Sequence, residues 1–252
     1  MRKHDCWHAP PDQLLLAQNE VHVWRAPLEM SASSVEHLQH FLVDEEIERA
    51  RRFYFEKDRQ HWIVAHALLR IILGQYLKSD PRELRFTTND YGKPSIVSPL
   101  VGKRLHFNLS HSGDLVLYAL AYEREVGVDI EQMCAGIDYN ELATHYFSAH
   151  ECAALDALPA ALQEEAFFLC WSRKEAYIKA RGKGLSLPLD QFDVSLAPDE
   201  PPRLLGSREE PRAAEHWSLH ALFPGRGYAG ALATEGSGWQ LCCWQWQGET
   251  RR

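Results

Sequence analysis

Two carboxylates stand two residues apart in the stretch REVGVDIEQ. Val126, Val128 and Ile130 fall on every second position, as on a strand with one buried face. The same alternation places Asp129 and Glu131 together on the opposite face. Side chains at this spacing can reach one hard cation, which would turn their repulsion into attraction. The alternative is a pair of solvated acids on an exposed sheet face.

A third carboxylate lies in WSRKEAYIKARGKGL, a predicted helix that stops at glycine. Glu175 and Lys179 are four residues apart and share one face of this helix, with Trp171 one turn earlier. The glycines around Lys183 can bend the backbone and the ammonium toward an anion. The alternatives are an ordinary surface ion pair and a glycine C-cap with a basic residue on the helix dipole.

Polar residues also gather in FNLSHSGD, at a predicted strand end that leads into a tight turn. Asn108, Ser110 and Ser112 offer hydrogen bonds and His111 a cation, a combination that suits phosphate oxygens. The alternative is a hairpin whose polar residues satisfy their own turn. Upstream, the turn YGKP presents Lys93, which by itself can be a solvated charge.

The elements that position these groups follow from hydrophobic period and turn residues. The first half predicts a strand at EVHVWR, a helix with Asp44 as N-cap through DEEIERARRF, a helix including Trp62 to Tyr76, and a hairpin turning at Ser112-Gly113-Asp114. The second half predicts helices at YNELATHYF, AHECAALDAL and ALQEEAFFLCWSRKEAYIKAR, then strands at FDVSL, HWSLHALF, GYAGALAT and WQLCCWQWQ. The tract 199–212 is expected to be a surface loop. Helices followed by a sheet, twice, predict two α+β lobes.

The composition limits the partners and the compartment. The chain has 252 residues and a formal net charge of −8, so we expect no general attraction to nucleic acid or to an anionic membrane. No apolar run is long enough to span a bilayer, and the first residues have no secretory apolar core. None of the six cysteines stands in a C-x-x-C pair, which favours reduced thiols in a cytoplasmic protein.

The blocks FNLSHSGD, GVDIE and WSRKEAYIKARGKGL, in this order, resemble the 4'-phosphopantetheinyl transferases. The likeness is strongest to the long single-chain type that activates nonribosomal peptide and polyketide synthetases, and it extends from RARRFYFEKD to GKGLSLPLDQFDVSL. It implies an enzyme that transfers the phosphopantetheine arm of coenzyme A to a serine of an apo acyl or peptidyl carrier protein and releases 3',5'-ADP. It also implies two similar lobes, residues 1–122 and 123–252, in pseudo-twofold arrangement with the active site in the cleft between them.

The resemblance implies roles for the acidic residues and for one lysine. Asp129, Glu131 and Glu175 would bind Mg²⁺, with Mn²⁺ as a second candidate. Glu175 would take the proton of the incoming serine. Lys179 would contact the coenzyme and stabilise charge on its bridging and leaving oxygens.

The remaining implied contacts hold the co-substrate, coenzyme A. Ser110 and His111 would hold its phosphate groups, and Lys93 would reach the diphosphate or the 3'-phosphate region. The basic segment RARRF resembles the family's 3'-phosphate segment, so Arg49 and, further along, Arg59 are expected there.

Two other classes of function are compatible with parts of this pattern. A metal-dependent phosphodiesterase or nuclease also combines two carboxylates with an E-x-x-x-K element, although the acidic net charge disfavours it. A non-catalytic module that binds coenzyme A or a carrier protein would need to have lost metal ligands. We expect a monomer, and whether the carrier serves fatty-acid, polyketide or peptide synthesis stays open.

Overall fold

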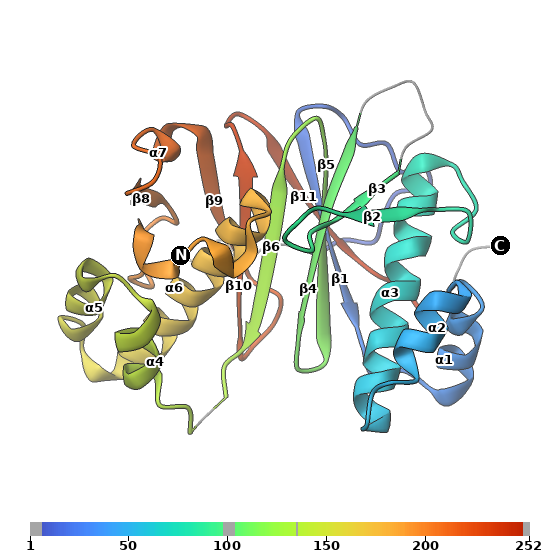
Figure 1. Cartoon of the computed structure of the whole chain (residues 1–252), viewed down its shortest axis with the longest axis horizontal. Helices are drawn as coiled ribbons and strands as arrows, with labels where there is room; N and C mark the ends of the chain where they lie inside the picture. The colour runs from blue at the N-terminus through green and yellow to red at the C-terminus, as the bar shows by residue number, and fades with distance from the viewer. Residues whose placement is uncertain (1–6, 98–103, 135, 249–252) are drawn as a thin grey trace.

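The computed structural model describes residues 7–97, 104–134 and 136–248 and contains two main β-sheets that lie side by side (Figure 1). The first has the strand order β11-β1-β5-β4 and the second β6-β10-β9. Strands β1 and β11 are parallel, whereas the other pairs in both sheets are antiparallel. The strands span Glu20–Pro27 (β1), Leu105–Ser112 (β4), Leu115–Tyr122 (β5), Val126–Gln132 (β6), Trp217–Leu222 (β9), Tyr228–Glu235 (β10) and Gln240–Gln245 (β11).

The first sheet is covered by α3 (Glu56–Leu77), with the short helices α1 (Ala32–Gln39) and α2 (Asp44–Ala50) beside it (Figure 1). Apolar side chains of α3 at three- and four-residue steps join a buried core with residues of β1 and β5. Tyr118 of β5 donates a hydrogen bond to the carbonyl of Ala65 at 2.8 Å. The predicted long helix of the first half is therefore confirmed.

The second sheet packs against α6 (Ala160–Arg181), which with α4 (Tyr139–Tyr146) and α5 (Ala149–Asp156) lies on the other side of the molecule (Figure 1). At Gly127 of β6, an added Cβ would overlap the backbone of Ala176 and Ala180. Only glycine permits this approach, which brings the strand of the paired acids directly onto the helix of the third. The predicted α+β class, with one long helix on each sheet, is confirmed.

A third core joins the two sheets, and it contains Val23, Leu117, Val128 and Leu232 among others. Beside this core, polar side chains of β4 accept hydrogen bonds from the backbone of β6. The amide oxygen of Asn108 accepts a hydrogen bond from Val128 N–H at 2.8 Å, and the hydroxyl oxygen of Ser112 accepts one from Gln132 N–H at 3.0 Å. Strands β4 and β6 therefore hold a fixed register where the two sheets meet.

The helix predicted with Asp44 as N-cap differs in detail. Helix α2 begins at Asp44, with Val43 as the N-cap, and it ends at Ala50 before the RRF segment. The Val43 N–H is satisfied by the carboxylate of Glu46 at 3.1 Å, so an acid inside the first turn replaces the expected cap.

The tract 199–212 is not wholly a loop. It contains β8 (Leu204–Ser207), which pairs with β7 (Phe192–Val194). Leu204 is buried, so one inward apolar side chain forms a strand within a polar, proline-containing tract. The remaining elements are the hairpin β2 (Phe86–Thr88) and β3 (Pro94–Ile96), the helix α7 (Ala213–His216) and two 3₁₀ turns (Gly184–Ser186 and Leu189–Gln191).

The division into lobes 1–122 and 123–252 stays a proposal. The last strand, β11, pairs with β1 and so belongs to the sheet of the first half. The first sheet therefore contains one strand from the second half of the chain. Among the described helices, none is both long and apolar enough to span a membrane.

Candidate active site

Asp129, Lys179 and Ser110 meet where β6, α6 and β4 come together. The Lys179 ammonium lies 2.5 Å from Asp129 Oδ1 and donates a hydrogen bond to Ser110 Oγ at 2.9 Å. Ser110 in turn donates to Asp129 Oδ1 at 3.0 Å. Asp129 is only 1% exposed, so the alternative of a solvated acid on an open sheet face is excluded for this residue.

The other two acids lie within electrostatic reach of Asp129. Glu131 follows it on the same face of β6 and accepts a hydrogen bond from Ser112 Oγ at 3.2 Å. Burial, together with the charge of Asp129, raises the pKa of Glu131 to about 7. Burial also raises the pKa of Glu175, against the charge of Lys179 and with that of Asp129. The charges of Asp129 and Glu175 thus influence one another, while the joint role of the three acids as metal ligands stays a prediction.

These acids fit a hard divalent cation. Asp129 Oδ2 is buried and has no hydrogen-bond partner in the described part of the chain, although buried polar atoms are normally satisfied. A cation would satisfy this oxygen, lower the repulsion between the acids, and find only oxygen donors. The ligand atoms of the three acids do not all lie within 4.8 Å of one another, unlike those of a separate cluster elsewhere, so binding would draw their side chains together.

Imidazoles and a guanidinium lie on the β4–α3 side of the acids. Burial lowers the pKa of His111, with further lowering by the charges of Lys179 and His61. Burial lowers the pKa of His66 to about 4, with Arg49 and His111 adding to the effect. These mutual effects place several potential cations close together, as a site for phosphate requires.

The two predicted arginines differ in their surroundings. Arg49 is exposed on α2, with its guanidinium carbon 5.8 Å from the centroid of the Trp62 ring, and it belongs to this cationic group. Arg59, near the start of α3, forms an ion pair with Glu56 at 2.5 Å. Its contact with the coenzyme stays a prediction.

Lys93 already has three acceptors. Its ammonium lies 2.6 Å from the Glu125 carboxylate and also donates to the carbonyls of Ala180 at 2.8 Å and Val126 at 3.3 Å. It thus ties the β2–β3 hairpin to the end of α6. Since an ammonium has three N–H donors, a contact with coenzyme A would require one of these bonds to break. That contact remains a prediction.

Sequence reasoning missed the roles of Asn108, Ser112 and Gly127. The sequence left open whether these two polar side chains contact phosphate oxygens or satisfy their own turn, and the structure shows that they bond to the backbone of β6. The signal for Gly127 was its place inside an otherwise apolar strand, which marks a close backbone approach.

Comparisons with known proteins show to which family the chain is similar. Residues 26–123 match the N-terminal part of 4'-phosphopantetheinyl transferases, and residues 125–233 match the 4'-phosphopantetheinyl transferase superfamily. The 4'-phosphopantetheinyl transferase HetI of Nostoc sp. is 36% identical over 240 residues, which cover 95% of this chain and 98% of HetI. The transferase Sfp of Bacillus subtilis is 37% identical over 170 residues, covering 68% of this chain and 73% of Sfp. The solved holo-[acyl-carrier-protein] synthase of Thermotoga maritima matches at TM-score 0.37 and 18% identity, over 45% of this chain and 63% of its own.

Proposed function

The chain belongs to the 4'-phosphopantetheinyl transferase superfamily, and on that premise we propose how it performs the transfer. It moves the phosphopantetheine arm of coenzyme A to a serine of an apo acyl or peptidyl carrier protein and releases 3',5'-ADP. The observation that supports this site is the Asp129–Lys179 ion pair beside a buried carboxylate oxygen that has no hydrogen-bond partner among the described residues. The nuclease and non-catalytic alternatives raised by the sequence are set aside by the family.

Asp129, Glu131 and Glu175 would hold Mg²⁺, or Mn²⁺ in its place. A bound divalent cation neutralises the diphosphate and acts as a Lewis acid at the phosphorus under attack. The raised pKa values of Glu131 and Glu175 reflect burial and like charge, and a cation would favour the ionised form of both. The protein's part is to keep these carboxylates partly dehydrated at the junction of its two sheets.

Glu175 acts as general base at its carboxylate oxygen. Because burial raises its pKa, its carboxylate binds a proton more tightly than a solvated one, as a base that accepts a hydroxyl proton should. Lys179 stays protonated. Burial opposes this state, but the charge of Asp129 and the hydrogen bond to it raise the pKa of Lys179 above its usual value. The held ammonium is then available to oxygens on which negative charge develops.

His111 and Arg49 bind phosphate oxygens of coenzyme A, and Ser110 joins them once its O–H is released from Asp129. His111 and His66 favour the neutral form while no anion is bound, since burial and neighbouring cations lower their pKa values. A phosphate between them would reverse part of this effect and favour protonated imidazoles. Arg59 would extend the contact once its present acceptor is released, whereas the contact of Lys93 stays a prediction from the sequence because all three of its N–H donors are used.

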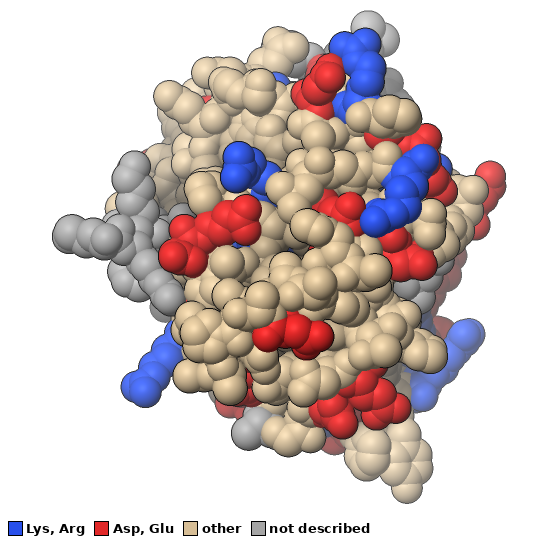
Figure 2. Space-filling view, turned by 90° about the vertical axis from the view of Figure 1, so that its left-hand side faces the viewer, with Lys and Arg blue, Asp and Glu red and all other residues tan. Residues whose placement is uncertain are grey.

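One face of the molecule has a surface of mixed charge. On the face at the left of Figure 1, basic side chains alternate with acidic ones and do not gather into one patch (Figure 2). With a net charge of −8, docking would therefore depend on local contacts rather than on long-range attraction of an acidic carrier. We propose a monomer in the cytoplasm, where the five cysteines of the described residues, which form no disulfide with one another, would stay reduced.

The test is a carrier-loading assay. The protein is incubated with coenzyme A, Mg²⁺ and a panel of apo carriers from fatty-acid, polyketide and peptide synthesis. We expect at least one carrier to gain the mass of one phosphopantetheine group, and 3',5'-ADP to appear in equal amount. A panel that keeps its original masses, with coenzyme A unconsumed, would contradict the proposal.

A further inference from the structure

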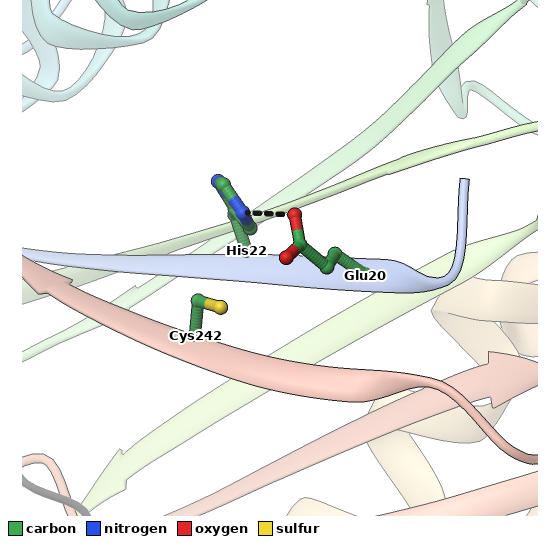
Figure 3. Close-up of side chains that lie close together, drawn as sticks. All are labelled: Glu20, His22 and Cys242. Atoms are coloured by element: carbon green, nitrogen blue, oxygen red, sulfur yellow. Dashed lines mark hydrogen bonds and ion pairs between the residues drawn. The ribbon is translucent and has the colours of Figure 1, made fainter. Parts of the chain in front are cut away.

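Three side chains with metal-binding atoms meet on the first sheet, on strands that hold none of the proposed active-site residues. Glu20 and His22 are two residues apart on β1, so they share one face. Cys242 is the register partner of His22 on the parallel strand β11, which places it on that face as well. Figure 3 shows the three side chains and the contact between Glu20 and His22.

The spacing of these side chains suits a small tetrahedral site. Their ligand atoms all lie within 4.8 Å of one another. His22 Nε2 and Glu20 Oε2 are 3.3 Å apart. Zn–N and Zn–O bonds of roughly 2.0–2.2 Å at a tetrahedral angle give an N···O separation of about 3.4 Å. The pair can therefore pass from a hydrogen bond to shared coordination almost without movement.

The other nitrogen of His22 is held as in metal sites. His22 Nδ1 lies 2.7 Å from the hydroxyl of Tyr76, and Trp24 Nε1 donates to the same hydroxyl at 3.0 Å. Metal-ligating histidines commonly donate their free N–H to such an oxygen, which fixes the ring and leaves the second nitrogen for the metal. In the tautomer that binds a metal, the proton sits on Nδ1 and is donated to the Tyr76 hydroxyl, which leaves Nε2, 3.3 Å from Glu20 Oε2, for the metal.

The protonation states and the access to solvent also suit a cation. His22 is only 2% exposed, and burial lowers its pKa, so that the neutral imidazole that binds metals is favoured. The Glu20 side chain is 24% exposed and leaves the cluster open at one side. Burial and the charge of Glu20 raise the pKa of the Cys242 thiol, and a cation would reverse this effect.

We propose that Glu20, His22 and Cys242 form a Zn²⁺ site that fastens the last strand to the first sheet. One nitrogen, one sulfur and one oxygen are the donors that zinc combines, with a fourth position left for water, whereas magnesium requires oxygen. Binding releases the thiol proton of Cys242 to solvent and forms the sulfur–metal bond. Because β1 and β11 lie far apart in sequence, the ion stabilises a long-range pairing between the first and the last described strand.

The test uses Co²⁺ as a spectroscopic substitute for zinc in the metal-free, full-length protein. We expect one equivalent of Co²⁺ to produce a sulfur-to-cobalt charge-transfer absorption, which Zn²⁺ then displaces. The acids of the active site offer only oxygen, so cobalt bound there cannot give this band. Zn²⁺ should also raise the midpoint of thermal unfolding as its concentration exceeds the dissociation constant.

Three variants show whether the band belongs to this cluster. Cys242→Ser should abolish it, and Glu20→Gln should weaken cobalt binding by at least about 10-fold, the lower effect seen when a group that supports a metal site is lost. Cys134→Ser, at an exposed cysteine, is the matched control and should leave the band unchanged. Circular dichroism and carrier loading verify that Cys242→Ser is folded and active.

Any of three results would overturn the proposal. The first is the absence of a sulfur-to-cobalt band in the folded wild-type protein. The second is a band that persists in Cys242→Ser or disappears in Cys134→Ser. The third is a thermal midpoint that Zn²⁺ shifts equally in the wild type and in Cys242→Ser, since the stabilisation would then come from another site.

Discussion

Helix α6 carries two lysine–carboxylate pairs that differ in exposure and in how completely their hydrogen-bonding groups are satisfied. Lys174 is fully buried, and its ammonium lies 2.7 Å from Glu151 Oε2 and from the carbonyls of Leu189 and Phe192. All three of its N–H donors are therefore used. Glu151 is equally satisfied, since it accepts hydrogen bonds from the N–H groups of Val194 and Ser148.

The Lys174–Glu151 pair is closed, in the sense that all its hydrogen-bonding groups are satisfied, whereas the Lys179–Asp129 pair, five residues further along the helix, is open. Lys179 is 28% exposed at its side chain and has two acceptors among the described residues, Asp129 and Ser110. Asp129 keeps one buried oxygen without a partner. The same residue types thus form a structural tie where every group is satisfied, and a candidate binding site where one is left over.

The largest effect should follow from Glu175→Gln. Loss of a general base lowers turnover by about 10²–10⁴-fold. Stability should not fall, because burial already disfavours the ionised form of this residue. The measurement is carrier loading per folded molecule, with Glu164→Gln as the control at an exposed position of the same helix. A Glu175→Gln protein with wild-type turnover would place the base elsewhere.

The closed pair should give the opposite result. Lys174→Met leaves the carboxylate of Glu151 buried without its cation, which costs about 3–5 kcal/mol of unfolding free energy. Turnover of the molecules that remain folded should be kept. The control is Lys183→Met, which breaks a half-exposed pair with Glu209 and should change stability by about 0–1 kcal/mol. Equal losses of unfolding free energy in the two variants, measured by urea unfolding, would show that the buried pair contributes no more stability than a half-exposed one.

The sequence predicted the acidic residues of the candidate active site better than it predicted the contacts around them. Strand alternation placed Asp129 and Glu131 on one face, and the four-residue step placed Glu175 beside Lys179. Local patterns cannot show that Asn108 and Ser112 bond to β6, since the pairing of these strands is set by the packing of two sheets. The function was predicted from the order of the sequence motifs, and the comparisons with known proteins confirmed this function.

The same limit applies to the last strand. WQLCCWQWQ reads as a strand, but nothing in it says that it pairs with β1 of the opposite half. The cluster of Glu20, His22 and Cys242 depends on that pairing, so it cannot be found from spacing along the chain. Leu204 illustrates a smaller loss, because polar neighbours hide a short buried strand.

Lys93 is a third lysine, and its substitution tests whether it has a structural role like Lys174 or a binding role like Lys179. With three acceptors it resembles Lys174, so Lys93→Met should cost about 1–3 kcal/mol of unfolding free energy, the penalty for leaving buried acceptors unpaired. The KM for coenzyme A should stay unchanged. A raised KM with normal stability would instead support the sequence-based contact with the coenzyme's phosphates.

The last effect concerns the pH dependence of stability. The pKa of Glu131 rises from 4.5 to about 7 on folding, so the folded protein holds this proton more tightly than the unfolded chain. In metal-free protein, its contribution to stability is present below pH 4.5 and is lost as the pH rises through 7. Glu131→Gln should flatten this part of the stability curve, and Mg²⁺ should reduce the loss at high pH. If the stability of the wild type depends on pH in the same way as that of Glu131→Gln, folding does not raise the pKa of the Glu131 carboxyl group.

The central claim is that the open pair marks a divalent-metal site, and binding of Mn²⁺ in the presence of coenzyme A, followed by electron paramagnetic resonance, tests it most directly. The wild type should bind one ion per chain at the oxygen-only site, and Glu20→Gln should bind it as tightly. Asp129→Asn should lose it. If Asp129→Asn binds Mn²⁺ with wild-type affinity while remaining folded, the account of the active site is contradicted.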